Sequence, residues 1–127
     1  MSVVGIGVDV CEISRMSAAL ARTPGLARRL FTDAERSDCR SADGQVRVGG
    51  LAARFAAKEA VAKAFGTGIR GFAFRDLEVR SDPLGRPTMA LHGGAALLAA
   101  QLGVAQVHIS LSTGVDLAVA NAVLETA

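Results

Sequence analysis

The feature that most constrains the fold is an alanine-rich stretch from Leu51 to Phe65, which is followed by Gly66. Alanine has the highest helix propensity and glycine is common just past a helix end, so the sequence predicts a helix over these residues. At the helical repeat, Leu51, Phe55, Ala62 and Phe65 fall on one apolar stripe. We expect the helix to bury this stripe.

Segments with β-type patterns stand on both sides of this helix. They cover residues 3–9, 76–80, 88–91, 107–112 and 116–124. The turn Asp82–Pro87 joins the second and third into a hairpin, and Thr113-Gly114 joins the last two. Val3 to Asp9 reads as a short buried strand that ends in an acid, and Ser41 to Gly50 as a loop. Strands and helices together predict an α+β fold.

Shorter helices are indicated elsewhere in the chain. Residues 13–30 have a helical pattern that is interrupted near Thr23-Pro24-Gly25, because a proline disfavours helix in the residue before it. Thr32-x-x-Glu35 is a capping box that opens a further short helix. Residues 94–102 form an Ala/Leu-rich helix that ends at a glycine. No repeat or linker divides the chain, so we expect residues 1–127 to form one domain.

Composition excludes several classes of protein. Half of the 127 residues are hydrophobic and 20% are charged, which is typical of a globular domain. The net charge is only +2, and the aromatic residues are five Phe with no Tyr or Trp, which disfavours a nucleic-acid-binding role. Asp9 and Glu12 stand where a signal peptide would be apolar, and no apolar run is long enough to span a membrane. We therefore expect a cytoplasmic protein whose cysteines, Cys11 and Cys39, are free thiols.

The basic residues are unevenly chosen. Twelve of the 14 are Arg, and the two lysines, Lys58 and Lys63, fall close together on the predicted helix. Glu59 lies at the edge of the apolar stripe, one turn before Lys63. Either Glu59 and Lys63 are solvated charges on the helix surface, or Glu59 is a metal-binding carboxylate beside a phosphate-binding lysine. Asp9 supplies a second carboxylate, and one or two carboxylates together with substrate phosphates and waters are the usual ligands of Mg²⁺.

Two further patterns are compatible with phosphate binding. On a strand, His108, Ser110 and Ser112 share one face, which is either a polar site for a pyrophosphate or an ordinary exposed strand face. Gly66 to Gly71 satisfies G-x-G-x-x-G, but it follows a helix, whereas a dinucleotide-binding fingerprint follows a strand and opens a helix. A backbone nest for phosphate at this helix end remains an alternative.

Four motifs in order resemble those of a known family. They are G-I-G-V-D from Gly5 to Asp9, R-F-A-A-K-E-A-V-A-K-A-F-G-T-G from Arg54 to Gly68, G-R-P from Gly85 to Pro87, and H-I-S-L-S from His108 to Ser112. The chain resembles the holo-acyl-carrier-protein synthases, the short single-domain 4′-phosphopantetheinyl transferases. It departs from that family at Thr113-Gly114, where a histidine or another polar residue is common. The resemblance implies a long central helix packed on an antiparallel sheet.

The resemblance also implies an activity and a site. Phosphopantetheine would pass from coenzyme A to a serine of apo acyl carrier protein for fatty acid biosynthesis, releasing 3′,5′-ADP. Asp9 and Glu59 would hold Mg²⁺ against the coenzyme A pyrophosphate, which Lys63 and His108 would also contact. Glu59, alone or through a metal-bound water, would be the base. The residues implied to contact coenzyme A are Arg54, Lys58, Lys63, Gly66, Thr67, Gly68, Gly85, Arg86, Pro87, His108 and Ser110.

Charge distribution and the same resemblance indicate the partners. Between Glu12 and Asp33 the chain has no acid but four arginines, Arg15, Arg22, Arg28 and Arg29. Such a cationic face suits an acidic carrier protein, although a solvated helix face is the simpler alternative. The family is typically a homotrimer with active sites between subunits. A coenzyme A-binding module without chemistry and an inactive scaffold subunit remain the competing hypotheses, and both leave the Asp9 and Glu59 pair without a purpose.

Overall fold

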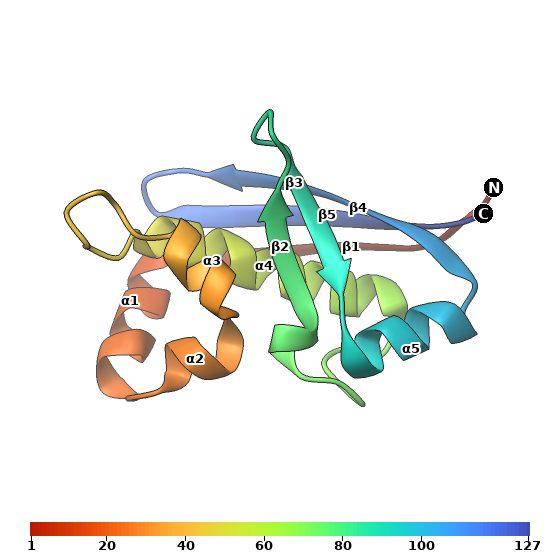
Figure 1. Ribbon diagram of the computed structural model, residues 1–127, viewed down its shortest axis with the longest axis horizontal. Helices are drawn as coiled ribbons and strands as arrows, with labels where there is room; N and C mark the ends of the chain where they lie inside the picture. Colours follow the sequence, from red (N-terminus) through yellow and green to blue (C-terminus); the bar gives the residue numbers. More distant parts are fainter.

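The sheet has three antiparallel strands in the order β1 (Val3–Glu12), β5 (Leu117–Thr126) and β4 (Val104–Thr113). A computed structural model describes all residues from Met1 to Ala127. Helix α4 (Val48–Phe65) lies along one face of the sheet, and both chain ends lie at the same end of the molecule (Figure 1). The central strand β5 pairs with both neighbours, which places Asp9 opposite Ala120 and Ser110 opposite Asn121.

A second layer covers the side of α4 that faces away from the sheet (Figure 1). Its elements are α1 (Ile13–Arg22), α2 (Leu26–Leu30), α3 (Asp33–Asp38), the 3₁₀ turn η1 (Phe74–Asp76), the hairpin β2 (Leu77–Ser81) and β3 (Pro87–Leu91), and α5 (Gly93–Gln101). The long helix is thus held between a sheet and a layer of short elements. The predicted α+β class and the predicted central helix on an antiparallel sheet are confirmed.

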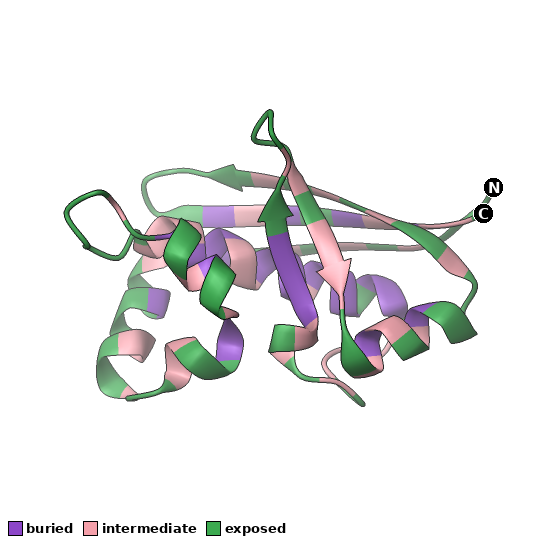
Figure 2. Ribbon diagram, in the orientation of Figure 1, coloured by how far each residue is buried: buried purple, intermediate pink, exposed green.

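Helix α4 is buried around most of its circumference, so the expectation of a single apolar stripe was wrong (Figure 2). Ala52, Ala56 and Ala60 are completely buried, and so is Val61. The reason is that layers pack on opposite sides of the helix, and small alanine side chains allow both to approach closely. The helix also begins at Val48, so the predicted loop 41–50 ends earlier than expected.

Strand β1 is longer than predicted, and most of its residues are exposed or half-buried rather than buried. It has 10 residues rather than the shorter run expected, and Asp9 lies within it rather than at its end. Gly5 and Gly7 face α4 so closely that an added Cβ would lie 1.9 Å from the carbonyl oxygens of Ala64 and Ala60 respectively. Only glycine permits this approach of two backbones, and it brings Asp9, on the same face of the strand, against the helix.

The opposite face of the sheet has no covering element within the chain. Ile6, Val8 and Val10 point to it and are 72%, 53% and 54% exposed. Because strand residues alternate between faces, Asn121 of β5 and Ser110 of β4 lie on this same side. We call this surface the open face.

Most local expectations hold. The helical pattern breaks at Thr23 to Gly25, and the Thr32 and Glu35 capping box has both of its hydrogen bonds. Gly66 ends α4 with a left-handed φ of 84°. Both hairpins form in the order predicted. No helix is both long enough and apolar enough to cross a bilayer.

Candidate active site

Asp9, Glu59 and Lys63 meet at the edge where β1 lies against α4. Lys63 Nζ donates hydrogen bonds to Asp9 Oδ1 at 2.9 Å and to the Val8 carbonyl oxygen at 3.2 Å. Glu59 lies one helical turn before Lys63 and is half-buried. The close approach of the Gly5 and Gly7 backbone to the helix is what brings the strand carboxylate to the helical pair.

The charges in this cluster are not balanced, because two carboxylates share one ammonium group. Burial, and then the charge of Asp9, raise the pKa of Glu59, while Lys63 opposes the shift. The hydrogen bond to Asp9, and then its charge, raise the pKa of Lys63. A divalent cation would relieve the repulsion between Asp9 and Glu59, and their oxygen donors are the kind that Mg²⁺ prefers. The donor set therefore fits the metal implied by the sequence.

The loop after α4 lies beside Lys63 and is built mainly to end the helix. The Gly66 amide donates to the Lys63 carbonyl oxygen at 2.9 Å, and the Gly68 amide donates to that of Ala62 at 3.2 Å. The Thr67 hydroxyl donates to the Gly68 carbonyl oxygen at 2.8 Å. The amides of Gly66 and Gly68 are thus occupied, and the nest for phosphate suggested by the glycine spacing does not form from them in this conformation.

Lys58 and Arg54 do not join the cluster. The Lys58 side chain is completely buried, and its Nζ lies 2.7 Å from Glu35 Oε1. Burial lowers the pKa of Lys58 and the charge of Glu35 opposes the shift. The predicted contact between Lys58 and phosphate is therefore wrong for this conformation, because no surface of its ammonium group is open. Arg54 donates to the Gly50 carbonyl oxygen at 3.2 Å, one turn back toward the helix start.

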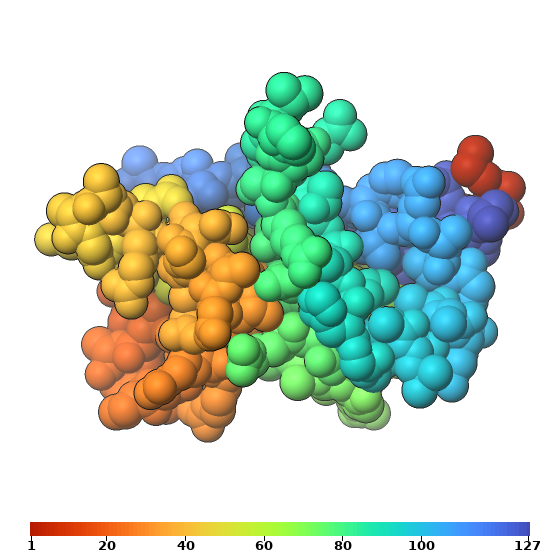
Figure 3. Space-filling view, in the orientation of Figure 1, coloured from red at the N-terminus to blue at the C-terminus, as the bar shows by residue number.

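The remaining predicted contacts lie elsewhere on the chain. His108 and Ser110 are exposed on the open face, where His108 Nε2 lies 3.1 Å from Glu125 Oε1. Gly85 and its neighbours form the tip of the β2–β3 hairpin, which projects beyond the body of the molecule (Figure 3). Within one chain, the structure does not bring these residues to Asp9, Glu59 and Lys63.

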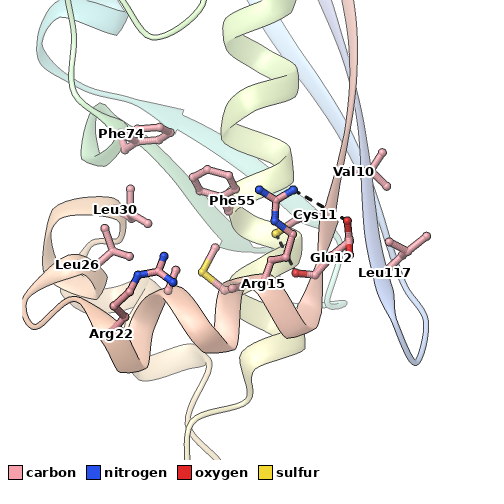
Figure 4. A pocket seen from close by; sticks show the side chains of 12 residues that line it. Val10, Cys11, Glu12, Arg15, Arg22, Leu26, Leu30, Phe55, Phe74 and Leu117 are labelled. Atoms are coloured by element: carbon pink, nitrogen blue, oxygen red, sulfur yellow. Dashed lines mark hydrogen bonds and ion pairs between the residues drawn. The ribbon is translucent and has the colours of Figure 1, made fainter.

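A large groove lies between α1, α2, the end of β1, α4 and η1 (Figure 4). Its volume is about 780 Å³, and Phe55 and Phe74 stack in it with ring centroids 5.4 Å apart. Arg15 and Arg22 line it, whereas Arg28 and Arg29 are exposed on α2. The sequence did not identify this groove. The helical repeat predicts Phe55 only as part of a buried stripe, and no spacing rule pairs it with Phe74.

Comparisons with known proteins agree with the fold and the motifs. The model of the family described as ACPS, 4′-phosphopantetheinyl transferase superfamily, matches residues 5–120. A holo-[acyl-carrier-protein] synthase from Yersinia enterocolitica is 46% identical over 99% of this chain and 100% of that protein. One from Clostridium novyi is 44% identical over 97% of this chain and 88% of that protein.

Solved structures give the same result. The holo-[acyl-carrier-protein] synthase from Neisseria meningitidis superposes with a TM-score of 0.88 at 33% identity, covering 98% of this chain and 100% of that one. The enzyme from Bacillus anthracis, determined in complex with CoA (3′,5′-ADP), has a TM-score of 0.78 at 34% identity and covers 98% of both chains. The fold and the site define a transferase of the 4′-phosphopantetheinyl type. The chain belongs to the holo-[acyl-carrier-protein] synthase family within that superfamily.

Proposed function

We propose that this protein transfers the 4′-phosphopantetheine group from coenzyme A to a serine of apo acyl carrier protein, giving holo acyl carrier protein and 3′,5′-ADP, in support of fatty acid biosynthesis. The observation that carries the proposal is the Asp9, Glu59 and Lys63 cluster, in a chain that matches holo-[acyl-carrier-protein] synthases over its whole length. Residues 1–127 act as a single domain. The reaction is placed in the cytoplasm, where Cys11 and Cys39 would stay reduced.

Asp9 and Glu59 hold Mg²⁺ in this proposal. When bound, the ion supplies Lewis-acid polarisation of the attacked phosphate and neutralises its developing charge. Lys63 reaches the same phosphate with an ammonium group that is already oriented by Asp9 and the Val8 carbonyl oxygen. Glu59 is the candidate base that accepts the proton of the acceptor serine. The phosphorus–oxygen bond to the ADP portion breaks as the bond to serine forms.

The site is completed by a neighbouring subunit of a homotrimer. Asp9, Glu59 and Lys63 lie at one edge of β1, whereas His108 and Ser110 lie on the open face and cannot fold back to them. Lys63 also lines a hollow of about 670 Å³ that continues past β1 onto the open face, beside Ile6 and Val8. A second copy seated on this exposed apolar surface would bring its own His108, Ser110 and Gly85 to Pro87 turn to the nucleotide.

The carrier protein docks on the groove beside α1. Arg15 and Arg22 stand at its margin, and Phe55 and Phe74 provide an apolar interior (Figure 4). Arg28 and Arg29 extend the positive surface along α2. An acidic partner with an apolar contact face fits this combination, because charges at a rim guide encounter while apolar burial holds the complex.

The direct test is mass spectrometry of apo carrier protein incubated with coenzyme A, Mg²⁺ and the purified protein. A mass increase of one phosphopantetheine, absent when the metal is chelated, is the expected result. Binding of coenzyme A without a mass increase would instead show a binding module. An oligomer that neither binds nor transfers would show a scaffold subunit.

Sharing of the site between chains can be tested by mixing variants. Glu59→Gln and His108→Ala should each be impaired alone, because each removes one half of every site. Mixed trimers contain some sites with both wild-type residues, so co-refolded variants should regain part of the activity. Light scattering should give a trimer for each variant. A monomer, or a mixture with only the summed activities of its components, would refute the shared site.

A further inference from the structure

A buried polar network joins α4 to the second layer, on the side of the helix away from the sheet. Lys58 is at its centre. Its Nζ donates to Glu35 Oε1 at 2.7 Å, to the Phe74 carbonyl oxygen at 3.0 Å and to the Leu77 carbonyl oxygen. An ammonium group has three donors, and all three are used. Lys58 is therefore held in one position and has no hydrogen left for a ligand.

Glu35 connects this lysine to two other elements. Its Oε1 also accepts from the Thr32 amide at 3.0 Å, and its Oε2 accepts from the Val79 amide at 2.9 Å. The Thr32 hydroxyl in turn donates to Glu78 Oε2 at 2.7 Å. The capping carboxylate of α3 is thus bonded at the same time to the long helix and to strand β2, which runs beside it (Figure 1).

The network lies next to the active-site residues along the helix. Lys58 immediately precedes Glu59, and successive residues of a helix project about 100° apart. Fixing the Lys58 ammonium on one side of α4 therefore fixes the rotation of the helix that presents Glu59 to Asp9. At its other end, the network holds β2, and the hairpin that starts there carries Gly85 at its tip. The network therefore connects the helix that carries Glu59 with the hairpin that carries Gly85.

Stability alone does not account for this arrangement. Replacing a buried ion pair with well-packed apolar residues is often neutral or stabilising, because the charges lose their hydration on burial. Directional hydrogen bonds, in contrast, require one specific geometry, and a fully satisfied buried network adds this requirement to the close packing of α4. We propose that Glu35, acting through Lys58, is a positioning residue for the transfer reaction: it sets the rotation of α4 that holds Glu59 against Asp9. The inference rests on the function proposed above.

The test separates positioning from stability with the double variant Glu35→Leu/Lys58→Met, which leaves no charge unpaired. We expect a folded protein with a lowered unfolding midpoint, because the Val79 amide and the Leu77 carbonyl oxygen lose their buried partners. We also expect a kcat lower by about 10-fold or more, since small misplacements of reacting groups are costly. Titration with Mn²⁺ in the presence of coenzyme A should show weaker metal binding. Wild-type kcat and metal affinity in this variant would overturn the proposal.

Two further variants keep the result interpretable. Val61→Ala, on the same helix, should lower the unfolding midpoint while leaving the network and kcat intact, provided that it is assayed well below that midpoint. If the double variant does not fold, Glu35→Asp serves instead: it keeps the charge but is too short to reach both Lys58 and the Val79 amide. A folded Glu35→Asp protein with normal kcat would equally refute the proposal. Wild-type turnover in the same assay is the separate check on the proposed function.

Discussion

Lys58 and Lys63 stand five positions apart on one helix and have opposite surroundings. Lys58 is 0% exposed and pairs with a carboxylate that is itself 0% exposed. Lys63 is 54% exposed and pairs with Asp9, which is 19% exposed. One ammonium group has all its hydrogens committed within the protein, and the other stands beside two carboxylates at the margin of a hollow.

The difference shows how one helix can serve two purposes. On the side facing the second layer, charge is closed off from water and acts to hold elements in place. At the β1 edge, charge is left open and uneven, which suits a group that binds a metal ion and phosphate. Residue type does not distinguish the two lysines, but the layer that each one meets does. The following predictions test this contrast.

The largest expected effect is on folding. Lys58→Met would leave Glu35 charged and buried without its partner, which costs about 3–5 kcal/mol. Lys63→Met removes a partly exposed pair and should cost about 1 kcal/mol or less. Urea unfolding of the two variants gives both free energies directly. Equal losses of unfolding free energy would contradict the proposed difference between the buried and the exposed lysine.

Lowering the pH should reduce the free energy of unfolding through the buried carboxylate of Glu78. Burial opposes ionisation of Glu78, yet hydrogen bonds from Thr32, His92 and Arg80 lower its pKa from 4.5 to about 2. A depressed folded-state pKa adds stability above pH 4.5 that is lost as the pH falls toward 2, amounting to about 3 kcal/mol. Unfolding free energies measured between pH 6 and pH 2 should show this loss. Glu78→Gln should be less stable at pH 6 and should flatten the profile, and an unchanged slope would contradict the assignment.

Removing the Glu59 carboxylate, where β1 meets α4, should abolish most of the transfer activity without loss of the fold. Glu59→Gln keeps size and shape but removes the charge that holds Mg²⁺ and the capacity to accept the serine proton. We expect kcat to fall by about 10²-fold or more with little change in the unfolding midpoint. Asp38→Asn, an exposed acid on α3, is the control and should retain wild-type turnover. A folded Glu59→Gln protein with near-normal rate would remove the proposed site.

The smallest effect is expected at the docking surface. Reversing Arg15 and Arg22 to Glu should raise the KM for carrier protein several-fold and leave the KM for coenzyme A unchanged, because rim charges act mainly on encounter. The difference should shrink as salt is added, since the Debye length is about 10 Å at 0.1 M. Arg70→Glu, exposed in the loop after α4, is the matched control. Unchanged carrier kinetics at low salt would show that these arginines are only a solvated surface.

Several local features could be predicted because they depend on neighbouring residues. The capping box at Thr32, the helix end at Gly66 and the break at Thr23 to Gly25 all follow from backbone preferences over a few positions. The family motifs identified Asp9 and Glu59 as partners although they are 50 positions apart in the chain. Spacing alone could not have shown that they meet.

What the sequence by itself determined was therefore the class of fold, most of the local elements and the pair of carboxylates. Only the tertiary structure decided that Lys58 is enclosed, that Glu35 reaches beyond its own cap, and that His108 lies on the far side of the sheet. The physical reason is that helix ends and turns are set by short-range dihedral and hydrogen-bonding preferences, whereas burial depends on which layers pack together. A lysine has the same propensity on either side of α4, and its environment exists only once the sheet and the second layer have closed around the helix.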